Sequence, residues 1–114
     1  MKKVEAIFPE EKLDAVKSAL EDDGFVGMTI SYVKGRGQEG GILLEWRAGP
    51  YKVDFLPKIL LMIVVPEEQC KHVVQLIYDA CQPDSHDEEA ETENLGKIFV
   101  SSVEHVISVK CNKK

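Results

Sequence analysis

The spacing of apolar residues in the first third of the chain predicts a strand, a helix and a second strand. Residues 2–8 form the first predicted strand. In residues 11–23 the apolar side chains recur three and four positions apart, as on one face of a helix. Gly24 then supplies the left-handed conformation in which helices commonly end. Residues 28–33 alternate apolar and polar side chains, so the three segments together predict a βαβ unit.

A similar pattern returns after a long interruption. Residues 34–54 hold too many glycines and prolines for a helix and are too long for a hairpin turn, so they predict a long functional loop. Residues 59–65 form an unbroken apolar run that predicts a strand, and residues 70–81 repeat apolar side chains at helical spacing. Residues 97–100 and 105–110 predict two short closing strands.

This order of elements predicts an α+β fold, a ferredoxin-like double βαβ sandwich formed by a single domain over residues 1–114. Right-handed crossovers deliver both helices to one face of the sheet, so the chain itself leaves the other face uncovered. Residues 59–65 are nevertheless apolar on both faces, whereas a strand buried on one side alternates. A second copy of the same chain is the simplest cover for the other face.

Composition and charge narrow the function classes. No apolar run reaches the roughly 20 residues that cross a bilayer, and the N-terminus lacks an export signal, so we expect a cytoplasmic protein without membrane insertion. The net charge is −6, with acidic residues concentrated between 84 and 93 and no clustered basic face, which argues against nucleic acid as a partner. Cys70, Cys81 and Cys111 have no metal-type spacing, so we expect reduced thiols.

The candidate chemistry is that of binding, because no catalytic motif is present and we expect no enzyme. Residues 34–41 follow a strand and are rich in glycine, so their backbone N–H groups could approach an anion such as phosphate. Gly96 and Lys97 offer a second possible phosphate contact. His86 and Asp87 in the acidic stretch could ligate a cation, although a solvated charged loop is the ordinary interpretation.

Several sequence blocks resemble the PII family of nitrogen-regulatory signal-transduction proteins, of which this chain looks like a divergent member. The similarity lies in MKKVEAI, EKLDAVKSAL, GMTI, VKGRG, YKVDFLPK and IVVP, and later in GKIFV and VEHVISVK. It implies a homotrimer whose intersubunit clefts bind an adenine nucleotide, namely ADP, AMP or ATP. It also implies that the long loop, called the T-loop and spanning about residues 36–54, docks onto a target transporter or enzyme.

The resemblance also assigns roles to single residues. Lys58 matches a lysine that pairs with a carboxylate of 2-oxoglutarate in the family. Glu39 and Gly41 fall at the same effector site, which can also hold a magnesium ion. Tyr51 matches a tyrosine that is uridylylated in some members. The nucleotide-binding residues that it implies are Ile7, Gly27, Met28, Thr29, Gly35, Arg36, Gly37, Gln38, Val64, Gly96, Lys97 and Lys110.

Three departures from the family pattern bear on the ligand. The phosphate-binding B-loop, about residues 82–96, is longer than usual and acidic, so it would repel a triphosphate unless its carboxylates point outward or hold a cation. Ser108 and Lys110 replace two arginines, which weakens phosphate binding. Glu39 stands where the family has a glutamine that helps to ligate magnesium, and it adds a negative charge beside the dicarboxylate 2-oxoglutarate.

The departures leave two functions open. The first is a nucleotide-binding regulator that prefers ADP or AMP and acts on its target through the T-loop. The alternative is a divergent sensor of bicarbonate or metal, with a weakened nucleotide site and without 2-oxoglutarate sensing. The T-loop sequence contains an apolar cluster, formed by Ile42, Leu43, Leu44 and Trp46. This cluster could pack against the protein's own trimer, or it could insert into a partner protein.

Overall fold

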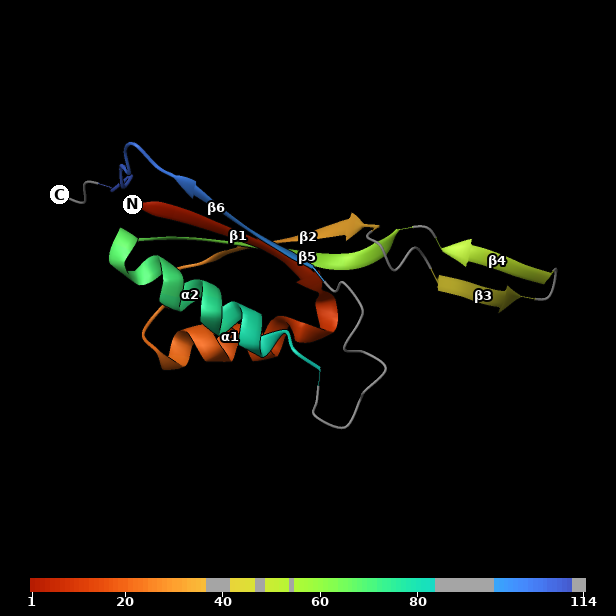
Figure 1. Cartoon of the computed structure of the whole chain (residues 1–114). Coiled ribbons are helices and arrows are strands. Elements are labelled where there is room, and N and C mark those ends of the chain that lie inside the picture. The colour runs from red at the N-terminus through yellow and green to blue at the C-terminus, as the bar shows by residue number, and fades with distance from the viewer. Residues whose placement is uncertain (37–41, 47–48, 54, 84–95, 112–114) are drawn as a thin grey trace.

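The computed structural model describes residues 1–36, 42–46, 49–53, 55–83 and 96–111, with backbone alone for 42–46 and 49–53. Within these described residues, nine elements follow one another (Figure 1). They are β1 (Lys2–Pro9), a short 3-10 helix η1 (Glu10–Lys12), α1 (Leu13–Asp22), β2 (Thr29–Gly35), β3 (Ile42–Trp46), β4 (Gly49–Val53), β5 (Leu56–Val65), α2 (Glu67–Ala80) and β6 (Lys97–Ser102).

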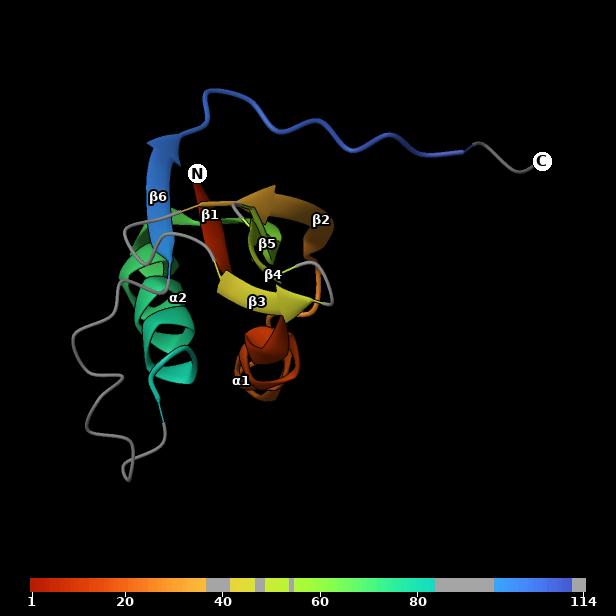
Figure 2. The same ribbon diagram turned by 90° about the vertical axis from the view of Figure 1, so that its right-hand side faces the viewer.

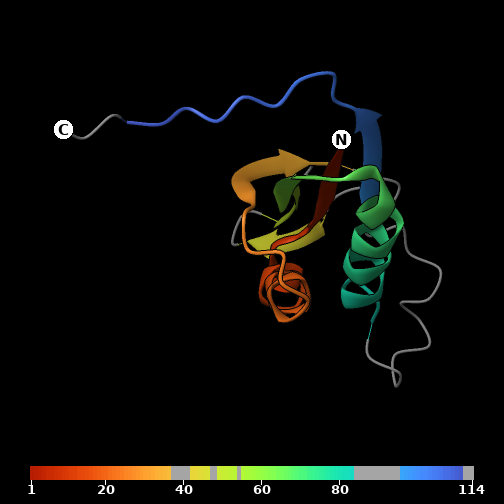
Figure 3. The same cartoon turned by 90° about the vertical axis from the view of Figure 1, so that its left-hand side faces the viewer.

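The main sheet has the strand order β2-β5-β1-β6, and every neighbouring pair is antiparallel. Strands β1 and β2 are therefore parallel to each other with β5 inserted between them, which is the split βαβ arrangement of a ferredoxin-like fold. Helices α1 and α2 lie side by side against the same face of the sheet (Figures 2 and 3). The predicted fold class and the one-sided placement of the helices are confirmed.

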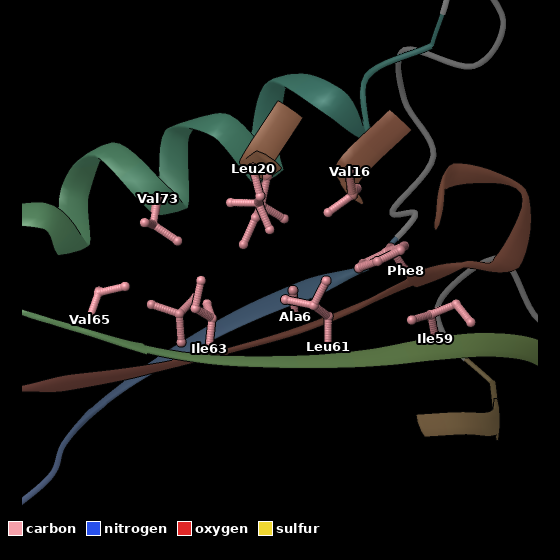
Figure 4. Close-up of a cluster of buried hydrophobic side chains, with 11 residues drawn as sticks. Ala6, Phe8, Val16, Leu20, Ile59, Leu61, Ile63, Val65 and Val73 are labelled. Atoms are coloured by element: carbon pink, nitrogen blue, oxygen red, sulfur yellow. The ribbon is translucent and has the colours of Figure 1, made fainter. Parts of the chain in front are cut away.

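The hydrophobic core fills the space between the sheet and the two helices (Figure 4). Alternate residues of β1 and β5 point toward the helices, and the helices return one apolar stripe each. Burying each large side chain stabilises the fold by roughly 1.5–3 kcal/mol. The buried residues are Val4, Ala6, Phe8, Val16, Leu20, Ile59, Leu61, Ile63, Val65, Val73 and Ile77.

The end of α1 follows the predicted glycine signal. Gly24 has φ +88°, a conformation that any side chain would strain. The turn lets the amide of Phe25 donate to the carbonyl of Leu20 over 2.9 Å, and the amide of Gly24 donate to that of Glu21 over 3.0 Å. These bonds satisfy carbonyls that have no partner inside the helix, so Gly24 ends α1 and turns the chain toward β2.

The segment 34–54, predicted as a long functional loop, contains regular secondary structure. Its first two residues continue β2, and β3 and β4 form an antiparallel hairpin that extends beyond the end of the sheet (Figure 1). The apolar run of 42–46 has the residue types that strands favour. Pro50 pairs with Glu45 in this two-stranded ribbon, where both strands are edges and the missing N–H of proline is tolerated.

The prediction of a strand at residues 105–110 is wrong for the single chain. The amide of Val103 donates to the carbonyl of Met1 over 3.1 Å, and beyond it the chain leaves the sheet in an extended path (Figure 2). Here Val106 is 54%, Ile107 85% and Val109 98% exposed. A strand requires a neighbour for its backbone hydrogen bonds, and among the described residues none lies beside this C-terminal segment.

Candidate functional site

The face of the sheet opposite the helices, called the open face below, carries six of the predicted ligand-binding residues. On β1, Ile7 lies between the buried Ala6 and Phe8 and therefore points the other way. It stands in register with Leu60 of β5 on one side and Lys97 of β6 on the other. Strand pairing thus brings residues from the whole chain onto one surface. The predicted site residues on this face are Ile7, Thr29, Gly35, Lys58, Val64 and Lys97.

Gly96 fits closely against the backbone of β1 where β6 begins. A Cβ at this position would lie 1.9 Å from the carbonyl oxygen of Ile7 and 3.2 Å from the Cα of Phe8. No side chain can occupy that space, so a glycine is required for Lys97 to enter the ladder opposite Ile7. The Lys97 residue is exposed, and its position beside Ile7 places a cation at the edge of the open face.

Lys58 places a second cation on the open face. It is 7% exposed and is the one charged residue that is buried within the described parts of the chain. It pairs with Val33 of β2, and its Cγ lies 3.4 Å from the position of a Cβ on Gly35. Water screens the charge of a buried lysine far less than that of a surface lysine.

Arg36 follows β2 directly, and its side chain stacks on an aromatic ring that the sequence analysis did not single out. The guanidinium carbon lies 5.5 Å from the ring centroid of Phe55. Phe55 precedes β5, and the last pair of the β2–β5 ladder joins Gly35 to Leu56. A cation–π contact therefore links the two chain ends from which the β3–β4 hairpin leaves the sheet. The order of residues along the chain gave no local signal for this contact.

Other predicted residues lie away from the open face or outside the described residues. Met28 packs against the hydrophobic core on the helix side, and Gly27 lies exposed in the turn before β2. Tyr51 stands on β4 opposite Leu44, and Lys110 lies in the C-terminal segment. The predicted residues outside the described ones are Gly37, Gln38, Glu39, Gly41, His86 and Asp87.

The open face combines apolar and charged side chains. Lys3 and Glu5 both point to it from β1, and their Nζ and Oε1 atoms lie 3.5 Å apart. Opposite Glu5 stand Met62 of β5 and the half-exposed Phe99 of β6. An ion pair at this exposure contributes little to stability by itself.

Cys70 lies in α2, and Cys81 directly follows this helix. Cys70 and Cys81 both pack against the core, as their position on the apolar stripe predicts. Burial raises the pKa of the Cys81 thiol to about 11, and the nearby Lys12 ammonium offsets only part of this shift. The thiol of Cys81 is therefore protonated at neutral pH and cannot act as a nucleophile.

The described residues contain neither a cluster of metal-ligating side chains nor a helix that could span a membrane. No three His, Cys, Asp or Glu side chains in these parts of the chain are grouped as metal ligands would be. Neither α1 nor α2, the two α-helices described, is both long and apolar enough to cross a bilayer. The predicted cation ligands His86 and Asp87 lie outside the described residues.

Fold and site together define a ferredoxin-like domain with cationic groups on an open sheet face. A family model described as "Nitrogen regulatory protein P-II" matches residues 1–113. The protein of that name from Rhizobium meliloti is 40% identical over 110 residues, which cover 96% of this chain and 92% of the relative. The one from Nostoc punctiforme is 42% identical over 114 residues, which cover 100% of this chain and 96% of the relative. "Nitrogen regulatory protein P-II 1" of Methanothermobacter thermautotrophicus is 44% identical over 112 residues, covering 96% and 90%.

This chain therefore belongs to the nitrogen regulatory protein P-II family. The resemblance drawn from its sequence blocks is confirmed over nearly the whole chain. Its relatives are named as regulatory proteins, which points to signalling and not to catalysis.

Proposed function

We propose that this P-II family member binds an adenine nucleotide in clefts between the subunits of a homotrimer and regulates a target transporter or enzyme through its β3–β4 hairpin. The observation that carries the proposal is that Ile7, Thr29, Val64 and Lys97, which come from β1, β2, β5 and β6, all lie on the open face, with Ile7 in register with Lys97. Apolar side chains suit the adenine ring, and a lysine at the edge suits a phosphate.

The trimer rests on two surfaces that the single chain leaves exposed. The open face carries half-buried apolar side chains beside the exposed Phe99. The C-terminal segment presents Val106, Ile107 and Val109 to solvent without a strand partner. Contact between copies would bury both surfaces, and it would supply the neighbour that the predicted strand at 105–110 requires.

The charge distribution favours ADP or AMP over ATP. Lys58 and Lys97 attract phosphate, but the B-loop sequence before Gly96 is acidic and adds repulsion that grows with each phosphate group. We expect the protein to act in the cytoplasm, with magnesium as a possible companion of the phosphates.

Calorimetric titration with ATP, ADP and AMP, each with magnesium and with or without 2-oxoglutarate or bicarbonate, tests the proposal directly. We expect ADP or AMP to bind, and Lys97→Ala to weaken binding about tenfold or more because a charge-assisted hydrogen bond is lost. Lys71→Ala, which removes an exposed lysine from α2, is the matched control. An unchanged dissociation constant in Lys97→Ala would remove that lysine from the site.

A second candidate function is favoured by the acidity of residues 84–93, which are rich in Asp and Glu and contain His86. In this alternative the protein senses a metal ion or bicarbonate, and the nucleotide site is weakened. Deleting residues 84–93 separates the two functions. The deletion should abolish metal binding under the alternative, and it should leave ADP binding intact or stronger under the main proposal.

A further inference from the structure

Three elements meet at the end of the sheet opposite the hairpin, where β1 begins, β6 ends and α2 starts (Figure 1). Lys2 of β1 stands in register with Ser102, the last residue of β6. The Nζ of Lys2 donates a hydrogen bond to the Oγ of Ser102 over 2.8 Å. It also lies 4.0 Å from Oε1 of Glu67, in the first turn of α2. The ammonium group of Lys2 therefore contacts both of the other elements.

The chain leaves the sheet directly after this contact. The amide of Val103 donates to the carbonyl of Met1 over 3.1 Å, and the next described residues, 104–111, belong to no strand of the sheet. The end of a strand frays readily, because its last backbone hydrogen bond is supported on one side only. A hydrogen bond from a charged donor is stronger than one between neutral groups. The Lys2–Ser102 bond therefore reinforces the last pair of the β1–β6 ladder, just before the chain departs.

We propose that Lys2 anchors the base of the C-terminal segment, residues 103–111, and so holds this segment ready to bind a second copy of the chain. The inference rests on the homotrimer of the proposed function, to which it adds a positioning residue. The segment carries three exposed apolar side chains, those of Val106, Ile107 and Val109. A segment that is fixed at its base samples fewer conformations, so less conformational entropy is lost when a neighbouring copy orders it.

Lys2→Met in the full-length protein tests the anchor, because it removes the ammonium group and keeps the apolar stem of the side chain. Hydrogen exchange of the Val103 amide, measured by NMR, should become about three- to tenfold faster, the range that one hydrogen bond from a partly exposed charged donor provides. Subunit exchange between isotope-labelled and unlabelled trimers, followed by native mass spectrometry, should accelerate by a similar factor. Lys2→Arg should restore both rates, because arginine keeps a cationic donor.

Two further variants separate the anchor from a general loss of charge. Lys17→Met removes a lysine whose Nζ also lies 4.0 Å from a glutamate, Glu21 of α1, and it should leave both rates unchanged. Ser102→Ala removes the acceptor, and adding it to Lys2→Met should have no further effect. The anchor is refuted if Val103 exchanges at the same rate in Lys2→Met as in Lys17→Met, and its role in assembly is refuted if subunit exchange alone stays unchanged. If the unmodified protein is a monomer, the homotrimer and the role in assembly both fail, and the Val103 exchange rate then decides whether Lys2 anchors the segment.

Discussion

Replacing Gly96 with alanine tests the close approach of β6 to β1. The added Cβ would lie 1.9 Å from the carbonyl oxygen of Ile7, whereas real Cβ contacts stay beyond 3.0 Å. The start of β6 must therefore move away by about 1 Å or more, a distance that disrupts the pairing of Lys97 with Ile7. Forcing one carbon atom into a well-packed site costs about 1–3 kcal/mol. This is a large share of the 5–15 kcal/mol by which domains of this size are typically stable.

Urea unfolding followed by circular dichroism measures the loss in the free energy of unfolding. In thermal unfolding, the Tm should fall by about 4 °C for each kcal/mol lost. Gly27→Ala is the matched control, because no atom lies within 4 Å of a Cβ at that position and its stability should hold or rise slightly. The ADP affinity of Gly96→Ala should fall as well, since Lys97 moves with the strand. If Gly96→Ala and Gly27→Ala unfold at the same urea concentration, β6 does not approach β1 as described.

Four other variants probe the core, the turn, the Cys81 thiol and the trimer. Leu61→Ala, at a fully buried position of β5, should lose about 2–5 kcal/mol in urea unfolding. Gly24→Ala should lose roughly 1–2 kcal/mol in the same assay because its φ of +88° strains a side chain. Burial raises the pKa of the Cys81 thiol from its ordinary 9.0 to about 11. The contribution of this thiol to the free energy of unfolding is therefore intact below pH 9 and is lost as the pH rises to 11. Urea unfolding midpoints at pH 8 and pH 10.5, compared with those of Cys81→Ala, check this expectation. Truncation after residue 103 should shift the mass measured by light scattering from trimer to monomer.

The sequence predicts those parts of the fold whose signals are local. Residues 11–23 show helical spacing followed by Gly24, and the apolar run 59–65 lies within β5. The ends of elements differ by a few residues, as for β2, which continues to Gly35. These segments were predictable because each buries a face against the same core and repeats the period of its own secondary structure.

The elements that were mispredicted depend on partners that the sequence pattern does not reveal. The hairpin of β3 and β4 is held by pairing between its own two strands, while its glycines and prolines resemble those of an irregular loop. Residues 105–110 have strand-like composition but no neighbour within the described chain. The Arg36–Phe55 contact joins residues far apart in sequence, so only the closure of the β2–β5 ladder brings them together.

The projection of the β3–β4 hairpin separates two kinds of evolutionary constraint. The buried core that the structure describes comes from β1, α1, β5 and α2 alone. A two-stranded ribbon outside that core is marginally stable in water, so a contacting surface can reshape it at small energetic cost. Under the proposed function, a substitution in β3 or β4 would therefore change the binding of a target at little cost to folding, whereas a substitution at a buried position of β1 or β5 would destabilise the whole domain.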